Sequence, residues 1–493
     1  MRYLRTGIVV VLVLMLAGCS VGPRYARPSV PTPPNDDFKE AQGWKTAQPS
    51  DQQLRGKWWE IFGDPQLSAL EEQLTVANQD LKVAEARFRE ARSIIGFNRA
   101  AQFPTISTAP AAAYSRSSGN VPIFTSTVHQ AETGDYVLPF DLSYELDLWG
   151  QVRRTVAAAR EEAQATAADL ETTRLSLHAE LAFDYFEFCS ADAQKKLLDD
   201  TVKAYGDALQ LTINRFEGGA APKSDVAQAK TQLETTRVQD TDVSVQRARF
   251  EHAIAILIGK PPSALSIPPS PLDLKPPDIP FGLASQLLER RPDIAAAERR
   301  VAEANEQVGI ARAAFFPTIV LSATAGFEGS HPSNWFTWPS AFWAVGPTAI
   351  QTIFDAGRRK ATSRAALADY DAAVAGYRQS ALTAFQEVED NLAALRILEQ
   401  EAQQQQQATT SAQESLGIFN DRYIGGADPY LQVIAAQTIA LTNERNDVDI
   451  LRRRMDASVL LIKALGGGWN TTNLPPLTAN NRAVTEQEPR RRR

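Results

Sequence analysis

The sequence predicts a mainly α-helical protein with transmembrane β-strands, built from two copies of one unit and closed into a tube by further copies of the chain. Three observations predict this fold. The sequence repeats internally, its helical segments are too long for a compact domain, and the segments between them alternate apolar and polar residues. Such alternation is typical of strands with one apolar face, and strands cross a bilayer only as a closed barrel.

Composition excludes several classes of protein. The chain has 493 residues with 51 basic and 58 acidic side chains, a net charge of −7 that predicts no nucleic-acid partner. Its two cysteines and four histidines are scattered singly, which predicts no metal site and no thiol chemistry, and we expect no enzyme. Beyond the N-terminus, no apolar run approaches the roughly 18 residues of a membrane-spanning helix.

The N-terminus predicts a lipoprotein signal peptide over residues 1–18. Arg2 and Arg5 precede an apolar stretch from Ile8 to Leu16 that is too short to span a membrane as a helix. Small residues then lead to Cys19 in a pattern that looks like a bacterial lipobox, in which the cysteine thiol receives diacylglycerol. We therefore expect Cys19 to be the mature, lipid-modified N-terminus.

Three segments outside the folded units are expected to be irregular. Residues 19–57 are proline-rich and polar and predict an extended tether from the lipid to the body. A second proline-rich stretch, 266–282, predicts a linker between the repeats, and residues 471–493 predict a solvated tail ending in four arginines.

The internal repeat divides the rest of the chain into two units, 58–265 and 283–470. Arg215 to Ala220 matches Arg422 to Ala427 at an offset of 207 residues, whereas Phe103-Pro104 matches Phe316-Pro317 at an offset of 213. The slippage falls between these two pairs, in the segments that carry the strands and their loops, and length variation of this kind is typical of exposed loops.

Each unit is expected to contain three helical segments rich in Ala, Gln, Glu, Leu and Arg. They lie at about 64–101, 150–214, 222–259, 283–314, 356–421 and 428–465. At 1.5 Å per residue the second would be about 100 Å long, which suits a rod or a tube. On the helices alone, an ordinary coiled coil remains an alternative.

Two strands are expected in each unit, at about 104–116 and 136–148, and at about 317–328 and 341–353. Within 136–148 every even position is apolar or aromatic, whereas Asp141 and Ser143 lie on the opposite face. Prolines within three strands argue against regular pairing and must be absorbed by bulges or strand ends: Pro110, Pro139 and Pro347. A soluble sandwich is the alternative interpretation.

Four strands cannot close a barrel, so we expect the chain to form a ring of identical copies. Two copies would give eight strands and a filled interior, whereas three would give twelve strands and the beginning of an aqueous lumen.

Several motifs together resemble a known family. They are Cys19-x-Val21-Gly22-Pro23, Trp58-Trp59-x-x-Phe62-x-Asp64-Pro65, Tyr144-Glu145-Leu146-Asp147-Leu148-Trp149-Gly150, Arg291-Pro292-Asp293, Phe354-Asp355-x-Gly357-Arg358 and Ala464-Leu465-Gly466-Gly467-Gly468-Trp469. On these residues the chain resembles the TolC-like outer-membrane efflux channels, in their lipoprotein (NodT-type) branch. The resemblance covers about residues 19–470.

The resemblance implies a fold, an anchor and a set of partners. It implies a homotrimer whose twelve-stranded barrel in the bacterial outer membrane continues into a periplasmic α-helical barrel. It also implies N-palmitoyl and S-diacylglycerol groups at Cys19, contact with outer-membrane lipid, a periplasmic membrane-fusion adaptor and an inner-membrane transporter of the resistance-nodulation-division (RND) class. The implied function is a passive exit duct for small toxic compounds or drugs. A type I secretion outlet and a non-conducting, periplasm-spanning structural lipoprotein remain alternatives.

The resemblance also suggests site residues at the two helical hairpin turns. Adaptor contacts are implied for the tips at Arg215, Gly218 and Gly219 and at Arg422, Gly425 and Gly426. Leu431 matches the family's apolar gate residue, but Ala435 and Thr438 stand where the family has an aspartate and an arginine. We therefore expect an apolar constriction at Leu431, with Tyr423 as a helix-locking hydrogen-bond donor, although turn glycines and a core leucine would explain the same residues.

Overall fold

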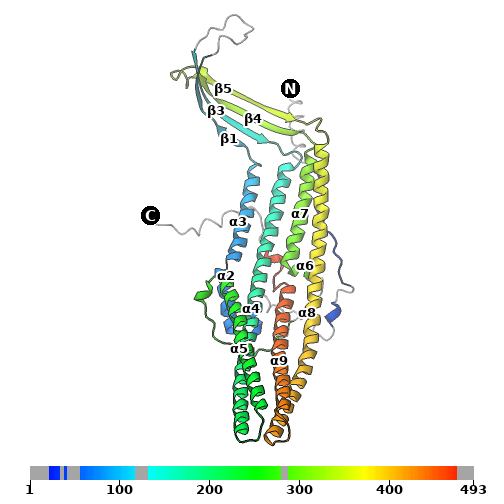
Figure 1. Ribbon diagram of the computed structural model, residues 1–493. Coiled ribbons are helices and arrows are strands. Elements are labelled where there is room, and N and C mark those ends of the chain that lie inside the picture. The colour runs from blue at the N-terminus through cyan, green and yellow to red at the C-terminus, as the bar shows by residue number, and fades with distance from the viewer. Residues whose placement is uncertain are drawn as a thin grey trace.

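The structure is a computed structural model that describes residues 21–33, 38–41, 56–116, 132–277, 279 and 287–474. Long helices make up most of it, and one antiparallel sheet lies at one end (Figure 1). The helices are α2 (Pro65–Ala77), α3 (Gln79–Ala100), α4 (Gln151–Glu217), α5 (Lys223–Leu257), α6 (Leu287–Arg290), α7 (Pro292–Ala313), α8 (Arg358–Ile424) and α9 (Tyr430–Ala464). The strands are β1 (Thr105–Thr108), β2 (Ala111–Arg116), β3 (Glu132–Glu145), β4 (Thr318–Gly329) and β5 (Ala341–Ile350).

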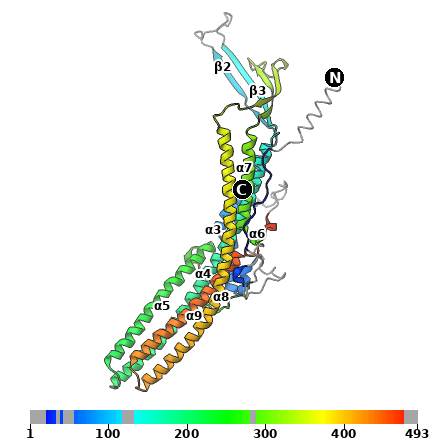
Figure 2. The same cartoon turned by 90° about the vertical axis from the view of Figure 1, so that its right-hand side faces the viewer.

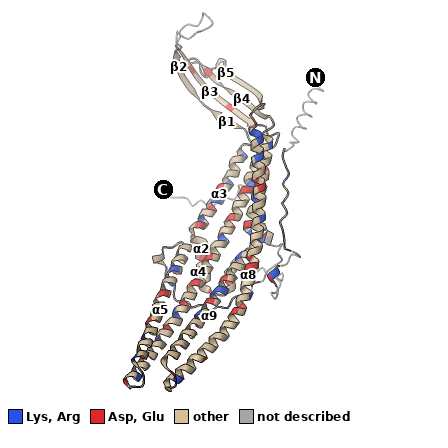
Figure 3. Ribbon diagram, turned by 45° about the vertical axis from the view of Figure 1, so that its right-hand side comes forward, with Lys and Arg blue, Asp and Glu red and all other residues tan. Residues whose placement is uncertain are grey.

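The molecule is an elongated, slightly bent rod. The sheet forms one end, helices α3, α4, α7 and α8 form the middle, and the paired hairpins α4/α5 and α8/α9 form the other end (Figures 1 and 2). Charged residues are spread along the helices, whereas the strands carry few of them (Figure 3). Along the chain, the order of short helix, strands, long helix and hairpin helix occurs twice, which confirms the duplication predicted from the sequence repeat.

The two long helices, α4 and α8, each have 67 residues. At 1.5 Å per residue each is about 100 Å long, so both run from the sheet to the hairpin tips. Each then turns back into a helix of 35 residues, α5 or α9. None of the helices in the described ranges combines the length and the apolar composition needed to cross a membrane.

In the middle of the sheet, the register aligns residues of similar polarity in two adjacent rows that cross β1, β3, β4 and β5. One row is apolar and runs Ile106, Leu142, Ala323, Val345. The next row runs Ser107, Asp141, Thr324, Ala344 and is mainly polar. Because directly opposed residues point to the same side of a sheet, the alternation seen in the sequence becomes one apolar and one more polar face.

The first expected strand is divided in two. Both β1 and β2 pair with β3 in one unbroken register, and they are separated only by Ala109 and Pro110. The carbonyl of Pro139 accepts a hydrogen bond of 2.7 Å from the Thr108 hydroxyl and so points toward β1. Because the N–H and C=O of a strand residue point to the same neighbouring strand, the donor that Pro139 lacks would also have faced this gap. The two prolines therefore share one interruption of the ladder. Pro347 lies on the edge strand β5, where a missing donor is tolerated.

The first helix of each unit is broken, which corrects the continuous segments expected at 64–101 and 283–314. Asn78 ends α2 with an extended ψ of 132°, and its side-chain oxygen caps α3 by accepting from the Leu81 N–H at 2.9 Å. In the second unit, α6 ends before Arg291-Pro292, because proline disfavours a helical residue ahead of it.

A glycine packs against each of these breaks. A Cβ on Gly259 would lie 2.5 Å from the carbonyl oxygen of Ala77, and one on Gly466 would lie 2.1 Å from that of Arg290. Both glycines have positive φ, of +70° and +89°. The end of each hairpin thus fits closely against the first helix of its own unit.

The N-terminal segment 21–33 is extended and lies along the helices (Figure 2). The Val21 N–H donates to the Trp149 carbonyl at 3.0 Å. Further along, the Tyr25 hydroxyl donates to Glu298 of α7, and Arg27 donates to the Tyr377 hydroxyl of α8 at 3.1 Å. This part of the expected tether is therefore bound to the body. Residues 1–20, which include the expected signal peptide and Cys19, lie outside the described residues, as does the tail from 475 onward.

Candidate functional site

The two hairpin tips have the same backbone geometry. In each, an N–H just after the helix donates back to the arginine carbonyl: Ala220 to Arg215 and Ala427 to Arg422, both at 2.8 Å. The second glycine of each pair, Gly219 or Gly426, has a φ of +75°. This pattern is the usual left-handed end of a helix, so the turn alone explains these glycines.

The arginines of the two tips make different contacts. Arg422 forms two hydrogen bonds, of 2.6 and 3.0 Å, with the carboxylate of Asp428 on its own hairpin. Ala221 occupies the position of Asp428 in the first hairpin. Arg215 instead crosses to the second hairpin, where its Nη1 donates to the Ile424 carbonyl at 2.7 Å. One carboxylate therefore breaks the symmetry of the repeat.

Tyr423 packs inside the tip of one protomer. Its side chain is 3% exposed, and its ring lies 5.0 Å from that of Tyr430 and 4.7 Å beneath the Arg215 guanidinium. Its buried hydroxyl has no hydrogen-bond partner among the described residues. Within one protomer, then, Tyr423 does not act as the hydrogen-bond donor expected from the resemblance. Its ring holds Arg215 in place through a cation–π contact.

Leu431 lies on the surface of the protomer with 57% of its area exposed. Ala435 and Thr438 follow it at helical spacing, and both are exposed. The interpretation of Leu431 as a core residue within one protomer is therefore wrong. This face of α9 carries no charge at these three positions, and Thr438 accepts a 3.3 Å hydrogen bond from Gln232 of α5.

Two of the acidic residues near the tips are already used locally. The charge of Asp428 is paired with Arg422, whose hydrogen bond lowers the pKa of that carboxyl. Asp225, near the start of α5, is buried. Neither supplies a free carboxylate in place of the one that Ala435 lacks.

Sequence reasoning missed two exposed apolar side chains at the tips, Phe216 and Ile424. Each lies beside a tip arginine. The sequence signal for both was an apolar residue near the end of a helix, just before the glycines of a hairpin turn. Among the described residues, no group of histidine, cysteine, aspartate or glutamate side chains could hold a metal ion.

Comparison with known proteins covers nearly all of the chain. A family model described as "Outer membrane efflux protein" matches residues 70–260 and 283–467. The toluene efflux pump outer membrane protein TtgF of Pseudomonas putida is 33% identical over 480 residues, which are 96% of this chain and 98% of TtgF. The antibiotic efflux pump outer membrane protein ArpC of Pseudomonas putida is 32% identical over 462 residues, 93% of this chain and 94% of ArpC. The solved outer-membrane channel OprN is 29% identical with a TM-score of 0.84, and the alignment covers 92% of this chain and 100% of OprN.

Proposed function

The chain belongs to the outer membrane efflux protein family, and we propose that it is the exit duct of a tripartite pump for organic solvents and antibiotics. It is an outer-membrane channel that extends into the periplasm, and as an efflux channel it is not an enzyme. The substrate class rests on the relatives named for toluene and antibiotic efflux.

The observation that carries the proposal is the pair of free edges on the sheet. Within the described residues β5 pairs only with β4, and β1 and β2 pair only with β3, so both edges of one protomer are open. Exposed edges are not tolerated in lipid. We infer that three copies join edge to edge into a barrel of twelve strands, large enough for an aqueous lumen.

The same segment that lies along the helices supports a lipid anchor. Val21 is fixed at the junction of β3 and α4 by its hydrogen bond to Trp149. Cys19 is two residues earlier, and two extended residues span about 7 Å. Acyl chains on Cys19 would therefore enter the membrane that holds the strands. Intact-mass spectrometry of the native protein tests this point, because an unmodified Cys19 would exclude the anchor.

We place the periplasmic adaptor and the inner-membrane transporter at the hairpin tips. The glycine backbones and the exposed side chains of Phe216 and Ile424 offer a surface there. Arg215 and Arg422 form hydrogen bonds within the protomer, so we expect them to contribute to the contact by fixing the shape of the tips.

Deletion and complementation test the proposed function. Loss of the gene should increase sensitivity to toluene and to antibiotics, and the parent chain should restore tolerance. Leu142→Arg, which breaks the apolar face of the sheet, should not restore it, whereas Ser143→Arg should restore it at least in part. Unchanged sensitivity after deletion of this gene and its paralogues would overturn the proposal.

A further inference from the structure

One guanidinium joins the two hairpins of the protomer near the middle of the rod. Arg452 of α9 donates to Glu187 of α4, to Asp456 at 2.9 Å and to Asp449 at 2.8 Å. Three carboxylates thus share one positive charge, and the contact between Arg452 and Glu187 crosses from one hairpin to the other.

Asp456 is the most deeply buried carboxylate of this group. It is 7% exposed, and its Oδ1 is buried without a hydrogen-bond partner among the described residues. The side chain of Asp449 is much more exposed, so water screens its charge. Burial, and next the charge of Glu187, raises the pKa of Asp456 to about 7.

The charges that act on Asp456 are those of Glu187 on α4 and of Asp449 and Arg452 on α9 itself. Further charged groups lie beside Glu187 and Arg452: Asp184 of α4 and Arg249 of α5 interact with each other, Asp184 also interacts with Glu187, and Asp242 of α5 and Arg445 of α9 line the same cavity as Glu187 and Arg452. Burial raises the pKa of Asp184 to about 7 as well, so α4 adds a second group that titrates in this range. From α8, Glu399 and Glu401 pair with Arg454 and Arg453, and so leave Arg452 to its own partners.

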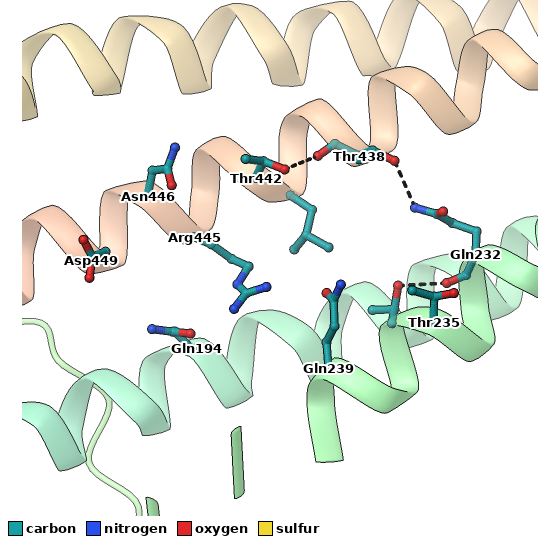
Figure 4. A pocket seen from close by; sticks show the side chains of 11 residues that line it. Gln194, Gln232, Thr235, Gln239, Thr438, Thr442, Arg445, Asn446 and Asp449 are labelled. Carbon is teal, nitrogen blue, oxygen red and sulfur yellow. Dashed lines mark hydrogen bonds between the residues drawn. The ribbon is translucent and has the colours of Figure 1, made fainter. Parts of the chain in front are cut away.

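Solvent reaches the cluster through cavities between the hairpins. One cavity of about 350 Å³ is lined by Glu187, Ser190 and Arg452. A second, of about 380 Å³, shares Gln194 and Arg445 with the first. Figure 4 shows Arg445 extending from α9 toward Gln194 and Gln239 on the facing helices. Solvent therefore reaches Glu187 and Arg452, and Arg452 is hydrogen-bonded to Asp456.

We propose that Asp456, acting through Arg452, is a positioning residue whose protonation sets how firmly the α8/α9 hairpin docks on α4/α5. When Asp456 is neutral, Arg452 balances only the two carboxylates of Glu187 and Asp449, and the hairpins stay docked. When Asp456 ionises, its charge repels that of Glu187 across the interface. This proposal concerns regulation of the channel and rests on the proposed function.

The direction of the pH effect follows from the raised pKa. The docked arrangement binds the proton more tightly than a separated one, because separation would expose Asp456 and return its pKa toward the ordinary value of an aspartate. Docking is therefore stabilised as pH falls below about 7 and weakened as pH rises through it. Arg215 lies 28 residues beyond Glu187 on α4, about 42 Å along the helix, so a small rotation at the cluster gives a large displacement at the tips.

Two readouts on the full-length assembled protein test whether Asp456 controls the docking of the two hairpins. In planar bilayers, the mean conductance of the parent should rise at least twofold between pH 6 and pH 8. Asp456→Asn should keep the low-pH value throughout. Asp449→Asn is the matched control, because it removes an exposed carboxylate from the same arginine and should leave the rise in place.

The second readout does not depend on conduction. Spin labels at Lys223→Cys and Gln432→Cys, both exposed at the tips, should move apart as pH rises in the parent but not in Asp456→Asn. Labels that separate equally in both proteins, or that never separate, would overturn the proposed role of Asp456. If no protein conducts at any pH, the proposed function fails, while the label distances still show whether Asp456 controls hairpin docking.

Discussion

Arg215 donates a 2.7 Å hydrogen bond to the carbonyl oxygen of Ile424, and so joins the two hairpin tips of one protomer. Its counterpart in the repeat, Arg422, is held by Asp428 on its own hairpin. The duplicated tips thus perform two tasks, because one arginine bridges the hairpins and the other closes its own turn.

The bridge predicts a difference between the two arginines. Arg215→Ala should release the second hairpin and raise the resting conductance, because no other described side chain bonds to the Ile424 carbonyl. Arg422→Ala, the matched control, should leave the bridge intact and change the conductance less. Equal conductance of the two variants in planar bilayers would show that the bridge does not restrain the tip.

The sheet register predicts which strand positions tolerate charge. Leu142 lies in the apolar row of the sheet and Ser143 in the adjacent row. If the apolar row faces lipid, Leu142→Arg should cost about 2–4 kcal/mol near the midplane, whereas Ser143→Arg should mainly affect the lumen. Trimer yield on unheated gels separates the variants, and equal yields would mean that the faces are assigned wrongly.

The fit at the end of α9 predicts opposite effects for two glycines. Gly466→Ala should destabilise the protein, because its Cβ would lie 2.1 Å from the Arg290 carbonyl oxygen at a φ of +89°. Gly417→Ala in α8 has no atom within 4 Å of the new Cβ and should stabilise its helix by about 0.5–1 kcal/mol. Thermal unfolding of the two variants measures both changes. A melting temperature for Gly466→Ala at or above that of the parent would contradict the close fit.

The sequence predicted the parts of this fold that depend on periodicity. Repeat offsets and alternation located the strands and long helices, because apolar spacing follows directly from helix and strand geometry. The break at Asn78 escaped it, because Asn78 acts through a cap and a 2.8 Å hydrogen bond to the distant Leu257 carbonyl. The break at Arg291 had a local signal in Pro292, which the expected helix 283–314 did not take into account.

The site was less predictable for a similar reason. The tip turns were readable from the glycines and the prolines that follow them, since turn chemistry is local. The partner of Arg215 lies 209 residues away, and only the folded chain brings Ile424 beside it. Tyr423 was expected to donate a hydrogen bond, but whether a hydroxyl finds an acceptor depends on packing that no local pattern encodes.

The missing acidic position predicts low sensitivity to cations. Ala435 is exposed one turn after Leu431, and neither Asp225, which is buried, nor Asp428, which is paired with Arg422, supplies a free carboxylate in its place. Ala435→Asp should place one carboxylate per protomer around a narrow axis and create block by divalent cations, because a ring of charge focuses the field. Bilayer recordings with and without millimolar Mg²⁺ test this. The parent should show little block, and equal block of parent and variant would place the constriction elsewhere.

The most direct test of the channel is the single-channel conductance of the assembled protein with and without Leu431→Ser. Leu431 is exposed on α9 with 57% of its area, and a polar, smaller side chain there should let water enter an apolar constriction. The parent should give discrete but small conductance steps, and Leu431→Ser should give larger ones with the same yield of inserted trimer. Inserted trimers that conduct in neither form would contradict the central claim that this protein is a duct.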